Sequence, residues 1–127
     1  MKKIINTSNA PAPVGPYNQS VQVGNLLFVS GQIALDPSTG TLINGDIQQE
    51  THQVMKNLGA ILTEAGCDYE DIIKTSVFVG DMQNYGRINE VYATYFKVDT
   101  APARELVEVA ALPKYVNVEI SAIVHKK

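Results

Sequence analysis

One long helical pattern interrupts the strand-like patterns of this sequence. Gly45-Asp46 offers an N-cap with Gln49 three residues on, as in a capping box, and Gly66 supplies a C-terminal stop. Between these signals, the apolar and small residues recur at steps of three and four: Ile47, Thr51, Val54, Met55, Leu58, Ile61, Leu62 and Ala65. The spacing predicts an amphipathic helix over residues 47–65.

Alternating apolar residues on either side of this helix predict strands. Before the helix, Ser20–Val23 and Leu26–Ser30 flank Gly24-Asn25, a pair that suits a two-residue hairpin turn of type I′ or II′. After it, residues 73–79 alternate, and the apolar face is predicted to carry Ile73, Thr75, Val77 and Val79.

A second helix and two further strands are predicted in the last third of the chain. Asp81 is placed to cap the helix, whose buried stripe would consist of Tyr85, Ile88, Tyr92, Tyr95 and Phe96. The first strand alternates Val107, Val109 and Ala111 with Leu106, Glu108 and Ala110. The last strand, over residues 116–124, has an apolar face and a mixed face, the latter made of Asn117, Glu119, Ser121 and Ile123.

The predicted order is strand, strand, helix, strand, helix, strand, strand. Each strand–helix–strand passage is long enough for a right-handed parallel crossover, which puts both helices on the same face of one mixed sheet. We therefore expect an α+β fold in which residues 1–127 form a single domain.

The sheet face away from the helices would carry Leu106, Phe78 and the mixed face of the last strand. These residues are too apolar for a free surface and too polar for a core. A second subunit is predicted to cover this face, in a homo-oligomer.

Composition and charge argue against several classes of protein. The formal net charge of −3 gives no electrostatic footprint for nucleic acid. The N-terminus begins like a signal peptide, but its apolar stretch stops after Ile4-Ile5, and no window reaches the roughly 18 apolar residues of a membrane span. We expect a cytoplasmic protein that contacts neither membrane nor nucleic acid.

The sequence offers no metal or cofactor signature. Cys67 is the only cysteine, so an intrachain disulfide is excluded, and its two interpretations are a small buried hydrophobe or a redox thiol. His52 and His125 are the only histidines and form no cluster with zinc-ligand spacing. Dinucleotide-binding, Walker A, C-x-x-C and G-x-S-x-G patterns are absent. Any chemistry is expected to come from side chains and water, without metal or cofactor.

Arg104 and Glu119 are the residues best suited to chemistry. Arg104 stands at the start of a strand, and its planar guanidinium could grip a carboxylate through two parallel hydrogen bonds. Glu119 lies on the mixed face of the last strand, expected to return beside the strand of Arg104, and could act as general base toward a water. The alternatives are an interface ion pair for Arg104, possible with Glu119 itself, and a structural hydrogen bond for Glu119.

Several other residues permit two interpretations. Gly15-Pro16-Tyr17 and Ser30-Gly31-Gln32 could line a pocket or merely shape turns. Asn89 on the second helix could be a ligand or a solvated helix residue. The residues themselves do not decide between these readings.

Taken together, the motifs of this chain resemble the RidA/YjgF family of reactive intermediate deaminases. The resemblance spans essentially the whole chain and is carried, in order, by Ala10–Tyr17 (APAPVGPY), Ser30–Ile33 (SGQI), Val77–Met82 (VFVGDM), Asn89–Tyr92 (NEVY), Pro102–Arg104 (PAR), Val107–Ala110 (VEVA), Leu112–Lys114 (LPK) and Val118–Ile120 (VEI). It implies a chorismate-mutase-like fold and a homotrimer with clefts between subunits.

The resemblance also implies an activity and a set of roles. The family hydrolyses 2-enamine and 2-imine acids, such as 2-aminoacrylate, 2-iminopropanoate and 2-iminobutanoate, to 2-oxo acids and ammonia. Arg104 would hold the substrate carboxylate and Glu119 would activate the water, while Tyr17, Ser30, Gly31 and Asn89 would line the cleft. A non-catalytic trimer that senses 2-oxo acids or amino-acid metabolites is the alternative function.

The chain departs from the family pattern directly after Arg104. Many members carry Ser-Cys at this point, whereas this sequence has Glu105-Leu106. Leu106 is expected to place a branched apolar group in the cleft, which argues against a thiol-dependent step and bears on the range of substrates. Glu105 adds a negative charge, and an ion pair with Arg104 would weaken carboxylate binding.

Overall fold

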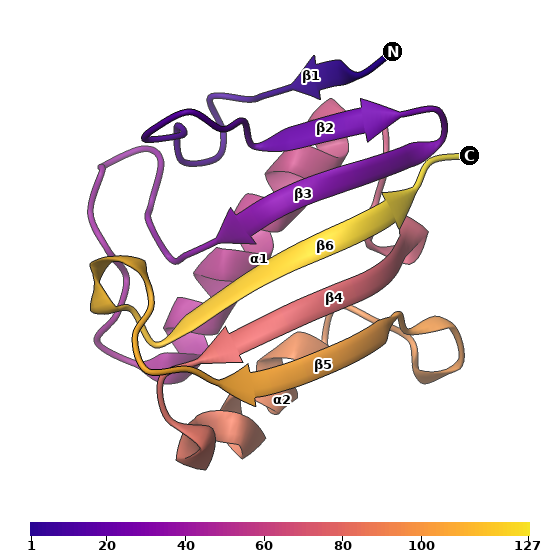
Figure 1. Cartoon of the computed structure of the whole chain (residues 1–127). Coiled ribbons are helices and arrows are strands. Elements are labelled where there is room, and N and C mark those ends of the chain that lie inside the picture. The colour runs from indigo at the N-terminus through magenta and orange to yellow at the C-terminus, as the bar shows by residue number, and fades with distance from the viewer.

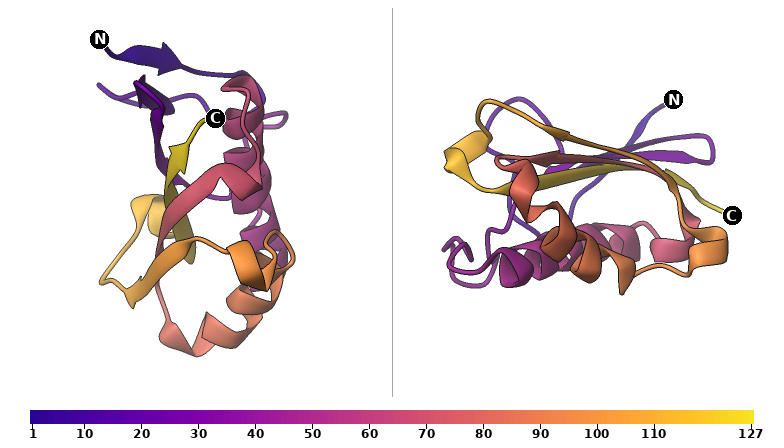
Figure 2. Two further views of the ribbon diagram at one scale, coloured as in Figure 1. Left: turned by 90° about the vertical axis from the view of Figure 1, so that its right-hand side faces the viewer. Right: turned by 90° about the horizontal axis from the view of Figure 1, so that it is seen from below.

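A computed structural model describes residues 1–127 and shows one six-stranded sheet with two α-helices. Both helices lie on the same face of the sheet (Figures 1 and 2). The sheet order is β1-β2-β3-β6-β4-β5. The elements are β1 (Lys3–Ile5), β2 (Ser20–Val23), β3 (Leu26–Gln32), α1 (Ile47–Glu64), β4 (Ile72–Val79), α2 (Tyr85–Ala93), β5 (Ala103–Glu108) and β6 (Val118–His125).

The predicted mixed sheet with both helices on one face is confirmed. β4 and β5 pair in parallel, and every other pair is antiparallel. β6 lies between β3 and β4 and pairs with both of them. The expectation that β6 returns beside β5 is therefore wrong, because β4 separates the two strands. The order also contains one strand more than predicted, since the three residues of β1 are too few to show an alternating pattern.

The long helix begins and ends at the predicted signals. The Asp46 side chain accepts a hydrogen bond from the Gln48 backbone N–H at 2.8 Å, although Gln49 does not complete a capping box. At the other end, Gly66 has a φ of +76°, and the Cys67 N–H donates to the Leu62 carbonyl at 2.8 Å. This left-handed termination satisfies carbonyls of the last turn and directs the chain back toward β4.

β4 departs from simple alternation at its first residues. A register shift between Ile72 and Lys74 against β6 reverses the direction of the first side chains. Ile72 is consequently buried, and Ile73, predicted to lie in the core, is 48% exposed. Beyond the bulge, Thr75, Val77 and Val79 are buried as predicted.

The second helix begins later than predicted. Asp81 caps a short 3-10 helix (Met82–Asn84), and α2 follows it from Tyr85. Ile88 and Tyr92 are buried as expected, whereas Tyr85 at the start of α2 is 42% exposed. Tyr95 and Phe96 lie beyond the end of α2 and pack on the core from there.

β5 also differs from the prediction, because it starts at Ala103 and ends at Glu108. Leu106 is opposite Val77, a buried residue, and it packs against the hydrophobic core. Placing Leu106 on the uncovered face was therefore wrong. Val107 is the exposed residue that lies on that face, opposite Phe78.

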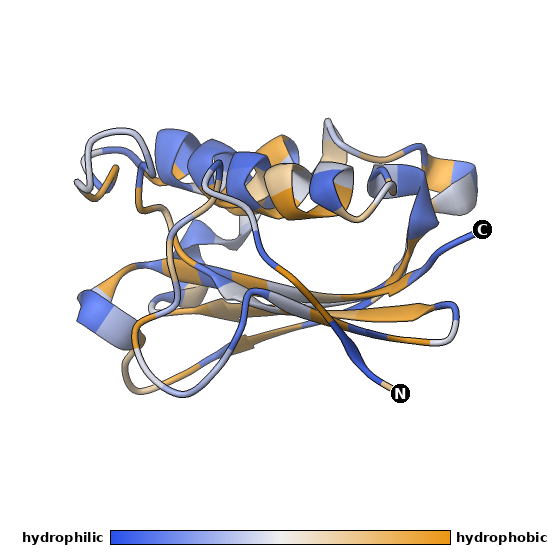
Figure 3. Cartoon of the chain, turned by 90° about the horizontal axis from the view of Figure 1, so that it is seen from above, coloured by the Kyte–Doolittle hydropathy of each residue, from blue (hydrophilic) through white to orange (hydrophobic).

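The face of the sheet away from the helices is uncovered in the single chain. Figure 3 shows apolar residues along the strands, although the helix layer lies on one side only. Leu26, Phe28 and Val107 are exposed there, beside the half-buried Glu119, Ser121 and Ile123 of β6. Neither α1 nor α2 is long and apolar enough to cross a membrane.

Gly59 of α1 gives the first testable prediction, because the Tyr69 ring lies directly against it. A Cβ at residue 59 would stand 2.9 Å from Tyr69 Cζ and still closer to the hydroxyl, which donates to the Met55 carbonyl at 2.7 Å. Gly59→Ala should therefore lower the midpoint of thermal unfolding, even though alanine is favoured over glycine in a helix by about 1 kcal/mol.

Gly86→Ala in α2 is the matched control. A Cβ at residue 86 meets nothing within 4 Å, so helix propensity alone should act there and raise the midpoint. Equal stabilisation by both substitutions would contradict the proposed crowding at Gly59.

Candidate functional site

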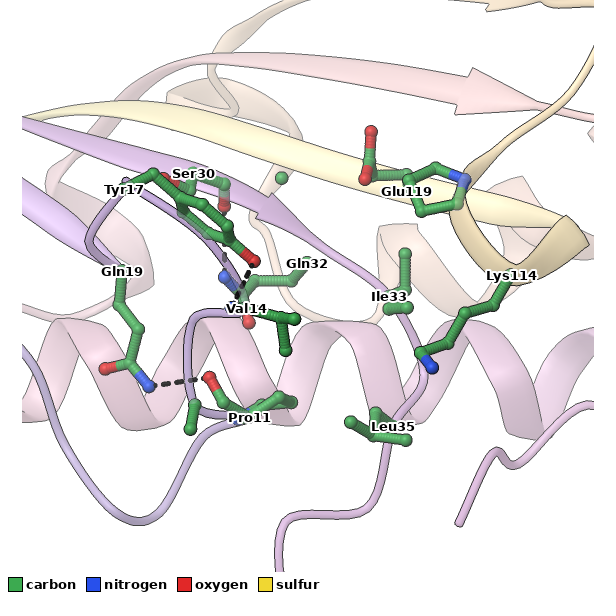
Figure 4. A pocket seen from close by; sticks show the side chains of 13 residues that line it. Pro11, Val14, Tyr17, Gln19, Ser30, Gln32, Ile33, Leu35, Lys114 and Glu119 are labelled. Atoms are coloured by element: carbon green, nitrogen blue, oxygen red, sulfur yellow. Dashed lines mark hydrogen bonds between the residues drawn. The ribbon is translucent and has the colours of Figure 1, made fainter. Parts of the chain in front are cut away.

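The first candidate hollow has a volume of about 460 Å³ and opens between the N-terminal loop, the end of β3 and the start of β6 (Figure 4). Four of the residues predicted from the sequence line it: Tyr17, Ser30, Gly31 and Glu119. Their elements are far apart in the chain and meet because β3 pairs with β6.

Glu119 is the only carboxylate in this hollow, and it has no hydrogen-bond or ion-pair partner in the chain. Burial raises the pKa of its carboxyl above the ordinary value of 4.5. The alternative of a structural hydrogen bond for Glu119 is thus not realised in the chain. A half-buried carboxylate with unused lone pairs is suited to accept a proton from water.

Gly31 allows Glu119 to occupy this position. A Cβ at residue 31 would stand 2.7 Å from Glu119 Cδ and 2.9 Å from its Cγ, distances that real side chains do not tolerate. The pairing of β3 with β6 is irregular here, with a register shift between Val29 and Gln32. The bulge and the absent side chain together leave room for the carboxylate.

The loop that forms the opposite wall is fixed by hydrogen bonds that the sequence did not reveal. Gln19 is buried, and its side-chain amide donates to the carbonyls of Thr7, Ala10 and Pro11. Ser30 Oγ donates to the Asn18 carbonyl at 2.7 Å, so this hydroxyl holds the same loop. The Ser30 side chain therefore lines the hollow and shapes the loop at once.

Lys114 is a second residue that sequence reasoning missed. It lines the hollow, makes no ion pair, and has a φ of 55°. Tyr115 has the same positive φ, so two consecutive non-glycine residues adopt the left-handed conformation. The LPK motif offered no signal for this backbone, because neither residue is glycine or asparagine.

Arg104 lies outside this hollow: it belongs to β5, and its side chain extends toward α2. Its Nη1 donates to Asn89 Oδ1 at 2.9 Å and its Nη2 donates to Tyr85 Oη at 3.1 Å. The guanidinium carbon is 4.8 Å from the Tyr92 ring centroid and 5.7 Å from that of Tyr85. A second hollow of about 250 Å³ adjoins Arg104 and Asn89.

The two candidate residues lie on opposite faces of the sheet. Arg104 is opposite Thr75, whose hydroxyl is 2.7 Å from the Tyr92 hydroxyl on the helix side. Glu119 is opposite Phe78, and its neighbours Val118 and Ile120 are the residues buried against the helices. The chain therefore divides the predicted residues into two groups, with Tyr17, Ser30, Gly31 and Glu119 in one and Arg104 and Asn89 in the other. An ion pair between Arg104 and Glu119 is not formed within the chain.

The two residues after Arg104 lie outside both hollows. Glu105 accepts a hydrogen bond from Ser76 Oγ and pairs with Lys74 Nζ at 2.9 Å, so it does not pair with Arg104. The hydrogen bond from Ser76, followed by that from Lys74, lowers the pKa of the Glu105 carboxyl. Leu106 packs on the core and lines neither hollow of the single chain.

The other reactive residues are accounted for by packing. Cys67 is buried, and burial raises the pKa of its thiol, which disfavours the thiolate that redox chemistry needs. His52 Nδ1 is 2.9 Å from the Tyr95 hydroxyl. No group of three or more His, Cys, Asp or Glu side chains is gathered closely enough to hold a metal ion.

Comparison with known proteins gives a consistent picture over the full length of the chain. Residues 7–126 match the family model described as Endoribonuclease L-PSP. A RutC family protein of Pyrococcus horikoshii is 50% identical over 127 residues, covering 100% of both chains. The 2-iminobutanoate/2-iminopropanoate deaminase of Mus musculus is 49% identical over 123 residues, covering 97% of this chain and 90% of its own.

Two solved structures of E. coli proteins are also similar to this chain over nearly its full length. The structure of TdcF from E. coli with bound serine has a TM-score of 0.92 and 42% identity, and the match covers 98% of this chain and 99% of TdcF. The structure of the YjgF gene product from E. coli has a TM-score of 0.92 and 43% identity over the same shares of the two chains.

The raised pKa of Glu119 predicts a pH-dependent effect on stability. Above both the folded and the unfolded pKa, the folded protein holds a charge that burial disfavours, whereas below 4.5 the carboxyl is neutral in both states. Glu119→Gln should therefore raise the free energy of unfolding at pH 7.5, and this gain should fade as the pH falls toward 4.

Urea unfolding of both proteins at pH 7.5 and pH 4, at one protein concentration, measures the difference. Glu64→Gln is the control, because Glu64 is exposed at the end of α1 and makes no ion pair. A gain of the same size at both pH values would show that burial of the Glu119 charge is not its cause.

Proposed function

Because this chain belongs to the YjgF/RidA family, we propose that it hydrolyses reactive 2-imino and 2-enamino acids to 2-oxo acids and ammonia. The observation that carries the proposal is Glu119, an unpaired carboxylate of raised pKa in a hollow large enough for a small acid. The deaminase name of the mouse relative supports the same reaction for this chain.

In the proposed mechanism, Arg104 binds the substrate carboxylate and Glu119 acts on the water. The imine carbon is already electrophilic, so orienting it against one water removes much of the barrier. As the water oxygen attacks this carbon, Glu119 accepts one water proton and passes it to the imine nitrogen, which gives a tetrahedral carbon bearing a hydroxyl and an amino group. Glu119 then accepts the hydroxyl proton and passes it to the amino nitrogen while the C–N bond breaks. Ammonia leaves, and the carbon keeps the water oxygen as a 2-oxo group. Positioned proton transfer of this kind contributes about 10²–10⁴-fold to a rate.

The site is proposed to form between two copies of the chain. Arg104 and Glu119 lie on opposite faces, and their strands are separated by β4, which sets them roughly 10 Å apart across the sheet. One small substrate does not reach both residues of the same chain. The uncovered apolar face offers a surface for a second copy, and we propose a homotrimer in which neighbouring chains supply Arg104 and Glu119.

Binding without turnover is the second candidate function. The structure of E. coli TdcF with bound serine favours it, because that relative holds an amino acid, which carries a carboxylate. A sensing protein of this kind would use Arg104 for the carboxylate and would not depend on Glu119 for turnover.

Activity assays distinguish the two candidates. A threonine dehydratase supplies 2-iminobutanoate, and the formation of 2-oxobutanoate is followed with and without the protein. Acceleration is expected, with Glu119→Gln lowering kcat by about 10²-fold or more and Arg104→Ala mainly raising KM. The activity should rise with pH through the raised pKa of Glu119, since the ionised form is the base.

Arg87→Ala is the matched control for Arg104, because Arg87 is the other arginine of the chain and its exposed side chain bonds only Asn84. Its kinetics should equal those of the wild type. Binding of 2-oxobutanoate without any acceleration would favour the sensing function, and full activity of Glu119→Gln would exclude the proposed base.

Complementation tests the site between copies. At a substrate concentration well below the raised KM, Arg104→Ala and Glu119→Gln are each expected to show little activity alone, but co-expressed chains assemble some sites that take Arg104 from one copy and Glu119 from the other. With random mixing, about a quarter of the sites should be intact and activity should return in proportion. A mixture as inactive as the separate variants, in oligomers shown by mass spectrometry to be mixed, would place both residues of a site in one chain.

A further inference from the structure

Arg104 lies in a cluster of hydrogen-bond donors that the chain itself does not neutralise. A guanidinium has five N–H groups and can only donate. In this chain two of them are used, one toward Asn89 Oδ1 and one toward Tyr85 Oη. The other N–H groups of Arg104 have no acceptor in the chain.

Its two partners are left as donors as well. Since Arg104 can only donate, the Asn89 amide presents its oxygen to the guanidinium and directs its NH₂ group elsewhere. The Tyr85 oxygen likewise accepts from Arg104, which leaves its own O–H proton free to donate. Tyr85 Oη makes no other hydrogen bond in the chain, and the side chain is 42% exposed.

Carboxylates of the chain do not fill this cluster. Glu105, the residue next to Arg104, is bound to Lys74 and Ser76 on the other face of the sheet. Glu90, the residue next to Asn89, accepts a hydrogen bond from Gln48. The guanidinium and the two side chains bound to it therefore offer donor groups around Arg104 without an anion from the chain.

We propose that the Tyr85 hydroxyl is a substrate-binding group that donates its proton to the carboxylate held by Arg104. This inference rests on the proposed function, because it assumes that Arg104 receives a carboxylate ligand. The hydroxyl relays no proton in the reaction and its contribution is to binding. It also stacks its ring near the guanidinium, so one side chain both orients Arg104 and completes the anion site.

The arrangement defines the ligand class. A carboxylate is planar and has lone pairs enough to accept from the guanidinium and from a hydroxyl at the same time. A neutral amide in its place would point an NH₂ group at a cluster made of donors. The site therefore selects ionised 2-imino and 2-oxo acids over their amides.

Tyr85→Phe tests the proposal, because it removes the hydroxyl and keeps the ring beside Arg104. The dissociation constant of 2-oxobutanoate, measured by calorimetry, should rise about tenfold, as expected for loss of a hydrogen bond to a charged group. KM for 2-iminobutanoate should rise by a similar factor with kcat unchanged. Tyr95→Phe is the matched control, since the Tyr95 hydroxyl is bound to His52 and its loss should leave both constants unchanged.

Replacement of Tyr85 by 3-fluorotyrosine separates donation to the ligand from mere orientation of Arg104. Fluorine makes the hydroxyl a better donor and a poorer acceptor. At pH 6.5, donation to the carboxylate predicts binding as tight as in the wild type or tighter. Weaker binding with both replacements would mean that the hydroxyl acts only as an acceptor for Arg104, and the proposal would be overturned.

The outcomes separate this proposal from the deaminase function. If the wild type binds 2-oxobutanoate without catalysing hydrolysis, and Tyr85→Phe still weakens that binding, the deaminase function fails and the role of Tyr85 stands. If the wild type is an active deaminase and Tyr85→Phe changes neither constant, the role of Tyr85 alone is refuted. If the wild type neither binds the 2-oxo acid nor hydrolyses the imine, both are refuted.

Discussion

The insertion of β6 between β3 and β4 is the constraint on which the rest of the structure depends. Because β6 is antiparallel to both neighbours, β3 and β4 run parallel, and the crossover through α1 places its helix on the same face as the α2 crossover between β4 and β5. The same pairing brings the carboxyl end of β3 to the start of β6. Gly31 and Glu119, far apart in the sequence, are thereby pressed together in one hollow.

Local signals in the sequence were enough to predict most of the helices and strands. The pairing of strands that are distant in the sequence could not be predicted from such signals. Asp46 and Gly66 act locally, so the ends of α1 followed from the residues around them. The bulge at Ile72–Lys74 depends on the facing residues of β6, which is why Ile73 was placed in the core by mistake. For the site, residue chemistry singled out Arg104 and Glu119 and the family resemblance added their expected roles, but their separation by β4 requires the strand order. Gln19 had no sequence signal, and Tyr85 was predicted to be buried in the second helix, since the hydrogen bonds of both side chains join segments distant in the sequence.

The two hollows hold polar groups of opposite kinds, and burying these groups without partners destabilises the single chain. One holds a carboxylate whose ionisation burial disfavours, and the other holds donors without an acceptor. Neither arrangement stabilises the chain by itself, since moving an unpaired polar group out of water costs free energy. In the function proposed above, a small acid with an electrophilic carbon would lie between them and make both favourable. In the proposed oligomer, the uncovered sheet face would be the surface through which two copies bring the hollows together.

Alternation along β5 explains how Arg104 tolerates an acidic neighbour. Adjacent side chains of a strand point to opposite faces, so Glu105 is directed away from the guanidinium as a matter of backbone geometry. On that other face, Lys74 and Ser76 occupy its carboxylate and lower its pKa, which keeps the charge fixed there. Glu105, the acidic neighbour of Arg104 in the sequence, is thus bound elsewhere and would not compete with the carboxylate that Arg104 is proposed to hold. Leu106 returns to the face of Arg104 but packs on the core. The departure from the family pattern in these two residues therefore leaves the donors around Arg104 available to an incoming acid.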